Sequence, residues 1–222
     1  MKNTIKKSWR DVTIDEYFEL VDKLNDPELE ETDKEVYKLS FINNIPEDDI
    51  WNLNIGEFRK LQVESLWMDD FKIQEDVKFK SLDINGSKYT IDTNLQNFTV
   101  AQYIDFQTFF PKRNTNPRVL GNILACFIIP QGKEYASGYD IYELVRSINS
   151  NLDILTANEI MFFFLKQYLI SIRALANYFN WMIKRLKKKA KNKKEILELE
   201  KNWEKVKETT LDGLRSLIML DN

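Results

Sequence analysis

The sequence offers few side chains that suit acid–base or metal chemistry. Acidic neighbours occur at Asp48 and Asp49 and again at Asp69 and Asp70, and paired carboxylates can hold magnesium or share a proton. The first pair follows shortly after Pro46, however, where acidic residues commonly stabilise the start of a helix. We therefore interpret these carboxylates as helix-end residues.

Two residue types that often carry catalysis are nearly missing, because the 222 residues contain no histidine and one cysteine. Without histidine the chain lacks the commonest general base, the usual Ser or Cys triads and most transition-metal sites. Cys126 lies in the apolar run ILACFII, which predicts a buried thiol. The phosphate loops GxGxxG and GxxxxGK[ST] are also absent. We expect a non-enzymatic protein with no catalytic residue, cofactor or metal.

The densest charged motif is the basic run KRLKKKAKNKK at residues 184–194. Its cationic side chains are Lys184, Arg185, Lys187, Lys188, Lys189, Lys191, Lys193 and Lys194. Such a run suits nonspecific contact with the phosphates of DNA, or contact with an acidic protein. Lysines outnumber arginine seven to one and no aromatic residue interrupts the run, which suits the solvated tip of a helical hairpin instead. These interpretations stay open.

Charge is divided unevenly along the chain. Residues 1–111 hold 13 Lys and Arg against 23 Asp and Glu, a net of −10. Residues 112–222 hold 19 against 12, a net of +7, so that the whole chain has a net charge of −3. Such asymmetry can orient a protein against copies of itself or against a partner.

The elements that must position these residues are mostly helices. A capping residue followed three positions later by Glu or Gln marks a helix start. The pattern occurs at Thr13 with Glu16, Thr32 with Glu35, Asn54 with Glu57, Thr99 with Gln102, Asp140 with Glu143, and Thr156 with Glu159. The predicted helices are 14–25, 33–44, 55–68, 100–110, 141–150 and 157–188. Pro117 predicts the start of a seventh helix that Pro130 ends, and an eighth covers 195–219.

One segment breaks the helical pattern. Asn85 and Gly86 lie between two short β-prone runs, which predicts a hairpin. The expected fold class is therefore mainly α, a multi-helix bundle with one short β-hairpin at about 77–92 and a long C-terminal helical hairpin or rod. We expect three parts: an acidic helical unit at 1–70, a hairpin connector at 71–98, and a helical bundle at 99–222 with the basic run at its tip.

The predicted helix 157–188 carries a continuous heptad seam, which favours a place at the centre of a bundle. The seam residues are Met161, Leu165, Tyr168, Ile172, Leu175, Phe179, Met182 and Leu186. Its apolar stretch has the length of a membrane span but contains Lys166, Arg173, Asn177 and Asn180, so we expect no contact with a membrane.

Aromatic residues divide into core candidates and interface candidates. Phe106, Phe109, Phe110 and Phe162–Phe164 recur at helical spacing, which is typical of a core. Trp9 and Trp51 lie near predicted helix starts, where a hydrophobic staple or a protein-interface anchor would suit. Trp203 lies on the apolar side of the last predicted helix and is the third interface candidate.

Two parts of the sequence resemble bacteriophage proteins. WRDVTIDEYFELVDKL, followed by an acidic stretch and then FINNIPEDDIWNLNIGEFRKL, resembles the N-terminal helical region of phage tail assembly chaperones. The centre, INGSKYTIDTNLQNFTVAQYIDFQTFF with ILACFIIPQGKEY after it, resembles proteins of crAss-like and other gut Bacteroidetes phages. The basic run at 184–194 is not part of this pattern.

The resemblance implies a phage structural or morphogenesis protein that binds other phage proteins through helical surfaces. One form of this expectation is a virion component near the portal, the neck or the packaged genome. A second is a tail assembly chaperone that is not retained in the virion, and a third is a DNA-binding accessory protein that uses the basic run. The expected location is the virion or the host cytoplasm during assembly, and homo-oligomerisation is a further expectation.

Overall fold

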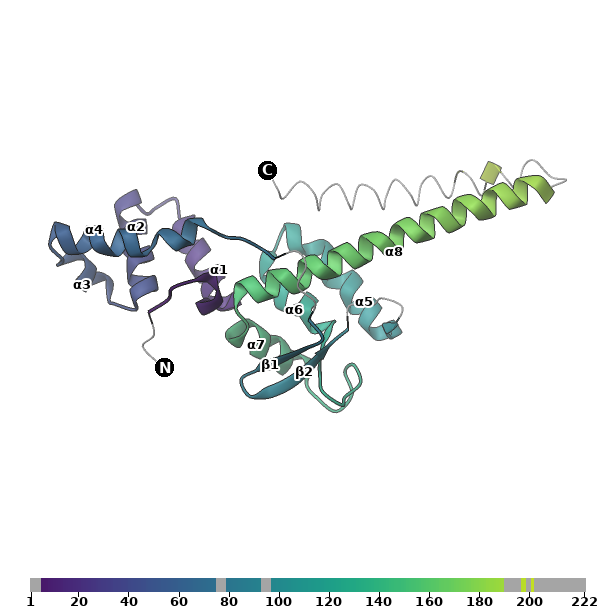
Figure 1. The fold of residues 1–222 in the computed structure, drawn as a ribbon, viewed down its shortest axis with the longest axis horizontal. Helices are drawn as coiled ribbons and strands as arrows, with labels where there is room; N and C mark the ends of the chain where they lie inside the picture. The colour runs from purple at the N-terminus through teal and green to yellow at the C-terminus, as the bar shows by residue number, and fades with distance from the viewer. Residues whose placement is uncertain (1–4, 75–78, 93–96, 190–196, 199–200, 202–222) are drawn as a thin grey trace. The chain divides into compact units, whose positions relative to one another are not determined.

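A computed structural model describes residues 5–74, 79–92, 97–189, 197–198 and 201 of the chain. The chain forms two compact units, residues 1–165 and 166–222. Within the described residues the structure is mainly helical with one small antiparallel sheet (Figure 1). The expected fold class is thereby confirmed, whereas the three expected parts 1–70, 71–98 and 99–222 stay a prediction.

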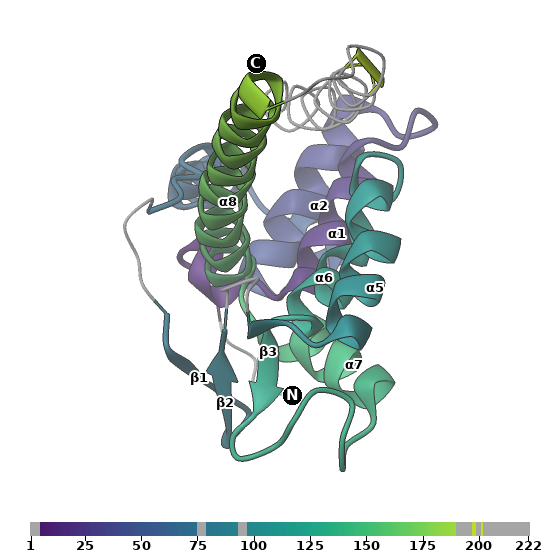
Figure 2. The ribbon, with the colours of Figure 1, turned by 90° about the vertical axis from the view of Figure 1, so that its right-hand side faces the viewer.

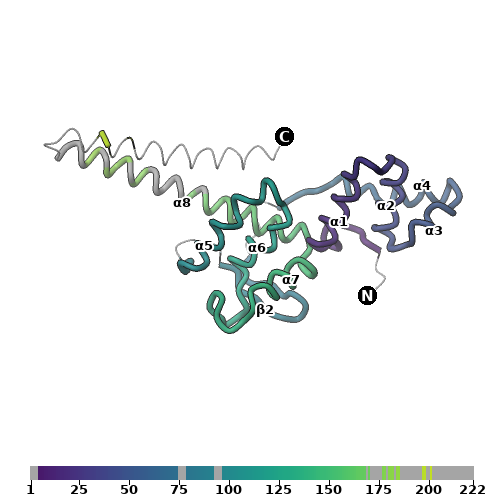
Figure 3. The backbone as a smooth tube through the Cα atoms, turned by 180° about the vertical axis from the view of Figure 1, so that it is seen from behind, coloured from purple at the N-terminus to yellow at the C-terminus, as the bar shows by residue number. Residues whose placement is uncertain are grey.

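Short helices follow one another through the first part of unit 1, and their path can be followed in Figure 3. They are the 3-10 turn η1 (Trp9–Asp11), α1 (Ile14–Leu24), α2 (Glu31–Asn43), α3 (Glu47–Trp51), α4 (Ile55–Glu64) and the 3-10 turn η2 (Leu66–Asp69). Val36 and Leu39 of α2 form a buried cluster with Ile50 of α3, and Phe58 and Leu61 of α4 cover it. This cluster holds α2, α3 and α4 together.

Helix capping explains several of these boundaries. Full capping boxes at Thr13, Asn54 and Thr99 begin α1, α4 and α5 (Val100–Phe109), as predicted. Asp140 caps α7 (Ile141–Asn151) through the amide of Tyr142. In each case a side-chain oxygen satisfies an amide that the first helical turn leaves without a partner.

Two of the predicted capping boxes are wrong, and Asp140 caps α7 without the predicted box to Glu143. The helix expected at 33–44 begins two residues earlier, because α2 starts at Glu31 and Glu30 takes the capping position instead of Thr32. The helix expected from Thr156 is α8 (Ile154–Lys189), in which the Thr156 amide instead donates to Asp153 Oδ1 at 2.8 Å. The side chains of Thr156 and Glu159 have a different use, described below.

The sheet has three antiparallel strands, one more than expected. β1 (Ser81–Ile84) and β2 (Ser87–Ile91) form the predicted hairpin, and both of its turn residues, Asn85 and Gly86, have positive φ. A third strand, β3 (Ile128–Pro130), pairs with β2, so that Thr90 faces Ile129 (Figure 2).

β3 corrects the helix predicted from Pro117 to Pro130. That segment forms the 3-10 turn η5 (Pro117–Val119), the short helix α6 (Leu120–Ala125) and then β3. A short, wholly apolar run fits a buried strand as well as a buried helix, so periodicity could not separate the two. Pro130 ends β3 on an outer strand of the sheet, where its missing N–H leaves no gap in the central ladder.

The core of unit 1 is aromatic where α5, β3 and the start of α8 meet. Phe106, Phe127 and Phe164 are fully buried. The Phe127 and Phe164 rings stack with centroids 4.3 Å apart, and the Phe106 ring meets Phe164 edge-on at 5.0 Å. The predicted core placement of Phe106, Phe110 and Phe164 is confirmed.

The N-terminal segment is hydrogen-bonded to the segment before α8. The Ile14 amide donates to the Leu152 carbonyl at 3.1 Å, and the Ile154 amide donates to the Val12 carbonyl at 2.8 Å. Between these two bonds Thr13 and Asp153 form an antiparallel bridge. This short ladder connects residues that are far apart in the sequence.

Replacing Gly121 with alanine should lower the free energy of unfolding by about 1–3 kcal/mol, because α6 and α7 approach closely there. A Cβ at Gly121 would overlap Asn149 Oδ1 and lie 2.8 Å from Asn149 Cγ. Asn149 Oδ1 is buried and has no hydrogen-bond partner among the described residues, so its removal should cost little. The double variant Gly121→Ala/Asn149→Ala should therefore regain most of the loss in urea unfolding. Equal losses in the single and double variants would contradict this explanation.

Beyond unit 1, α8 continues as one helix to Lys189. Most of the predicted last helix, 195–219, lies outside the described residues, so the choice between a hairpin and a rod stays open. No helix in the described ranges combines the length and the apolar character needed to cross a membrane.

Candidate functional site

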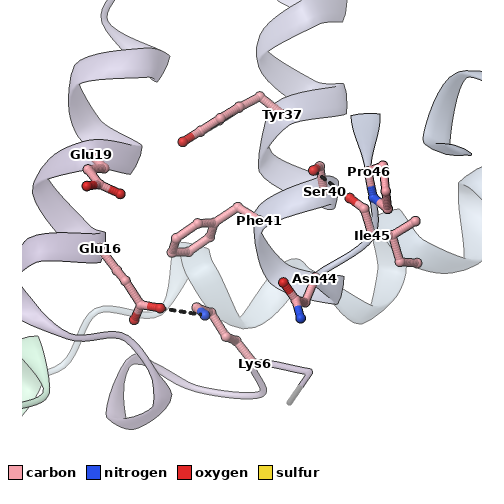
Figure 4. A pocket seen from close by; sticks show the side chains of 9 residues that line it. All are labelled: Lys6, Glu16, Glu19, Tyr37, Ser40, Phe41, Asn44, Ile45 and Pro46. Atoms are coloured by element: carbon pink, nitrogen blue, oxygen red, sulfur yellow. Dashed lines mark hydrogen bonds and ion pairs between the residues drawn. The ribbon is translucent and has the colours of Figure 1, made fainter. Parts of the chain in front are cut away.

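A concave feature in the described part of unit 1 is an open hollow between α1 and α2 (Figure 4). Its volume is about 560 Å³. The lining residues, which define what we call the acidic hollow, are Lys6, Glu16, Glu19, Tyr37, Ser40, Phe41, Asn44, Ile45 and Pro46. The hollow therefore combines carboxylates from α1 with two aromatic rings from α2.

Lys6 closes one side of the acidic hollow and is firmly held. Its ammonium donates to Glu16 Oε1 at 3.0 Å and lies 4.8 Å from the centre of the Phe41 ring. Its backbone amide donates to the Ile42 carbonyl at 2.8 Å. The other carboxylate oxygen of Glu16 accepts the Thr13 amide at 2.9 Å in the capping box. Both charges of this ion pair are thus already used within the chain.

Glu19 and Tyr37 face each other across the acidic hollow (Figure 4). The Glu19 side chain is exposed, and among the described residues no ion pair to its carboxylate is found. Burial raises the pKa of the Tyr37 hydroxyl above its ordinary value, and the carboxylates of Glu19 and Glu47 raise it further. The Tyr37 hydroxyl therefore lies in a negative electrostatic potential and stays protonated at physiological pH.

The far side of the acidic hollow is a tight turn after α2. Asn44 adopts a left-handed conformation with φ of 52° and ends the helix. The Ser40 hydroxyl donates to the Ile45 carbonyl at 2.6 Å, so its proton is already committed. Because neither side of the site presents an activated nucleophile, the arrangement suits binding better than covalent chemistry.

A second surface feature is a series of exposed apolar side chains along α3, α4 and the start of η2. Trp51, Ile55, Val63 and Leu66 are 53%, 67%, 67% and 60% exposed, and we call them the α3–α4 stripe. Ile55 and Val63 are eight residues apart, which keeps them in one half of the surface of α4, and Leu66 follows at the start of η2. Since Phe58 and Leu61 already cover the buried cluster from another side of α4, this helix has two apolar faces.

An ion pair with one buried partner joins the N-terminal segment to α8. Glu159 is fully buried, and its two carboxylate oxygens accept hydrogen bonds from Arg10 Nη2 at 2.7 and 2.8 Å. Arg10 Nη1 donates to the Thr156 hydroxyl and lies 3.5 Å from Asp153 Oδ1. The Gln74 amide also donates to Glu159, at 3.4 Å. This cluster is saturated with internal partners, which indicates a structural role.

The predicted tryptophan sites have different surroundings. Trp9 is buried and meets the rings of Tyr17, Trp67 and Phe71 edge-on, with centroids 5.2–5.7 Å apart. Trp51 is exposed on the α3–α4 stripe. Trp203 lies outside the described residues.

The predicted basic run is only partly described. Lys184 and Arg185 are exposed on α8, and Lys187, Lys188 and Lys189 lie on its last turn. Lys191, Lys193 and Lys194 lie outside the described residues. The Arg185 guanidinium lies 5.3 Å from the centre of the Trp181 ring, and the Trp181 and Tyr178 rings are 6.0 Å apart. Aromatic residues thus precede the run along the helix.

The remaining chemical candidates give no metal or thiol site. Within the ranges that the structure covers, no three His, Cys, Asp or Glu side chains gather closely enough to hold a metal ion. Cys126 is buried as predicted, and burial raises the pKa of its thiol to about 12. At neutral pH the thiol is therefore protonated and a poor nucleophile.

Sequence patterns indicated only part of these sites. The acidic character of the N-terminal half was visible in the sequence. The exposed position of Trp51 was not predicted, and neither was the acidic hollow, because three separate segments build it. Comparisons with family models, curated proteins and solved structures found no match for the chain.

Proposed function

We propose that this chain is a non-enzymatic bacteriophage structural or morphogenesis protein that binds other phage proteins through its helical surfaces. The α3–α4 stripe carries the proposal. A surface helix of a small globular unit normally turns polar residues outward, yet α4 exposes Ile55 and Val63 while its other apolar side covers the buried cluster. Grouped exposed apolar side chains of this kind mark protein-interaction sites.

The resemblance of the N-terminal and central segments to phage assembly proteins supplies the class of partner. The main form of the proposal is a virion component near the portal, the neck or the packaged genome. A tail assembly chaperone that leaves before the particle is complete is the alternative, since a stripe of this size also suits a transient contact with a client. Both forms place the protein in the virion or in the host cytoplasm during assembly.

A DNA-binding accessory role is the second candidate function. It is favoured by Tyr178, Trp181 and Arg185, whose side chains are neighbours on α8 just before the lysines of the basic run. Aromatic rings beside cations suit single-stranded nucleic acid, where bases stack while lysines contact phosphates. The α3–α4 stripe has no use in this role, so we rank protein binding first.

Quantitative mass spectrometry of purified particles of the encoding phage tests the main proposal. We expect the chain at a fixed ratio to the portal subunit. The double variant Ile55→Glu/Val63→Glu should lower that ratio at least about tenfold, because a charge replaces an apolar contact at each of two positions. Lys60→Gln, exposed on the same helix outside the stripe, should leave the ratio unchanged.

Two other results would be informative. Absence from particles together with abundance in infected cells would establish the chaperone form. Incorporation that the stripe variant does not change would show that another surface makes the contact. Circular dichroism of both variants should match that of the unmodified protein, since the replaced side chains are exposed and a folding defect is not expected.

A further inference from the structure

The acidic hollow has the chemistry of a receptor for a basic side chain. A lysine or arginine is attracted by a carboxylate and by the face of an aromatic ring, and both attractions strengthen when they act together in a partly enclosed site. The acidic hollow offers the Glu19 carboxylate opposite the Tyr37 ring (Figure 4). Its volume of about 560 Å³ leaves room for a long side chain.

The charges that face the acidic hollow leave an excess of negative charge. Lys6 is neutralised by Glu16 at 3.0 Å. The ammonium of Lys23, on α1, lies 5.9 Å from the centre of the Tyr37 ring, on α2. This ring therefore already has one cation near it. The negative charges are those of Glu16, Glu19 and Glu47, and the last two act on the Tyr37 hydroxyl. An incoming ammonium would therefore meet a net negative site.

The same site already contains an internal example of the contact. Lys6 binds Glu16 with its ammonium while it lies 4.8 Å from the centre of the Phe41 ring. A second basic side chain placed between Glu19 and Tyr37 would repeat this combination one helical turn along α1 and α2, because Glu19 is three residues after Glu16 and Tyr37 is four residues before Phe41.

We infer that the acidic hollow binds the basic run 184–194 of a second copy of this chain. The run carries eight cationic side chains in eleven positions, and Lys184 and Arg185 at its start are exposed. The acidic hollow lies in the half of the sequence with a net charge of −10, whereas the run lies in the half with +7. A contact between unlike surfaces of identical chains produces either a reciprocal two-fold dimer or, when it is head-to-tail, rings or open filaments.

The inference rests on the proposed function only in that both need protein–protein contact. The two can fail separately, because the acidic hollow and the α3–α4 stripe share no residue. A chain that joins copies of itself through one surface and binds other proteins through another would suit a repeated layer of an assembly.

Sedimentation velocity of the full chain, after nuclease treatment, tests the inference. At about 0.1 M salt we expect the mass to rise with protein concentration, and at about 1 M salt we expect the monomer, because salt screens exposed charges. Glu19→Lys should raise the dissociation constant about tenfold, and Lys188→Glu/Lys191→Glu should do the same.

The matched control is Glu143→Lys, which makes the same change of charge on the exposed side of α7 and away from the acidic hollow. It should leave the dissociation constant within about twofold of the starting value. A tenfold effect of this control would mean that net charge alone governs association, and this result would contradict the inference.

Other outcomes also overturn it. A monomer at every concentration would exclude a second copy as the occupant. Association that is present before nuclease treatment and lost after it would assign the basic run to nucleic acid. If the lysine variant weakens association while Glu19→Lys does not, the run meets a different surface. A change in sedimentation that is independent of concentration would show that the run binds within its own chain.

Discussion

Replacing Arg10 with alanine should lower the free energy of unfolding by about 3 kcal/mol, because it leaves the buried Glu159 carboxylate without its charged partner. Glu159 is fully buried, and Arg10 supplies two of its hydrogen bonds, at 2.7 and 2.8 Å. The Arg10 side chain is 40% exposed, so water can partly take its place. We therefore place the effect at the low end of the usual range for a broken buried pair.

Urea unfolding followed by circular dichroism measures this loss of stability. Two further variants serve as its controls. Arg10→Ala/Glu159→Gln should recover a large part of the stability, because no uncompensated charge remains. Arg118→Ala removes an arginine from an exposed pair with Asp22, and it should cost less than about 1 kcal/mol. If Arg10→Ala costs no more than Arg118→Ala, the pair does not connect the N-terminal segment to α8 energetically.

The same ion pair shows where sequence reasoning stops. Thr13 with Glu16 and Thr156 with Glu159 have the same spacing and the same residue types. The first is a capping box, whereas the second binds Arg10, which is 149 positions from Glu159 in the sequence. Asp153 begins the helix instead. Nothing within a few residues of Thr156 distinguishes the two cases, because the deciding partner comes from the other end of unit 1.

Local elements were predictable for the opposite reason. The helices that begin at Ile14, Ile55 and Val100, and the hairpin turn at Asn85, depend on hydrogen bonds between residues at most four positions apart. Such local contacts follow directly from the types and order of neighbouring residues. β3 was missed because its partner strand lies in another part of the chain, where Thr90 pairs with Ile129.

The candidate site follows the same division. An excess of acidic residues in the N-terminal half was visible in the sequence, and so was the basic run. The acidic hollow needs Lys6, two positions of α1 and the end of α2 at one place, and this arrangement depends on how α1 and α2 pack. The composition predicted the sign of the surface charge, whereas the packing of α1 against α2 determines where the surface is concave.

Replacing Phe164 with alanine should lower the free energy of unfolding by about 3–5 kcal/mol, through lost burial and the cavity that remains. The Phe164 ring is fully buried and stacks on Phe127 at 4.3 Å. It also lies 5.0 Å from Phe106 and 6.3 Å from Phe98. One side chain near the start of α8 therefore contacts residues from α5, from the segment before it and from the segment before β3.

Phe163→Ala is the matched control, because Phe163 is the preceding residue of the same helix and is only partly buried. Its loss should be clearly smaller, since less apolar area returns to water and no closed cavity forms. The comparison is informative because both variants raise the helix propensity of α8 by the same amount, so the difference between them isolates packing. A large difference means that the first turns of α8 are part of the core of unit 1. Equal, small losses would mean that α8 is stable without this core, and its heptad seam would then have to provide that stability from residues beyond Leu165.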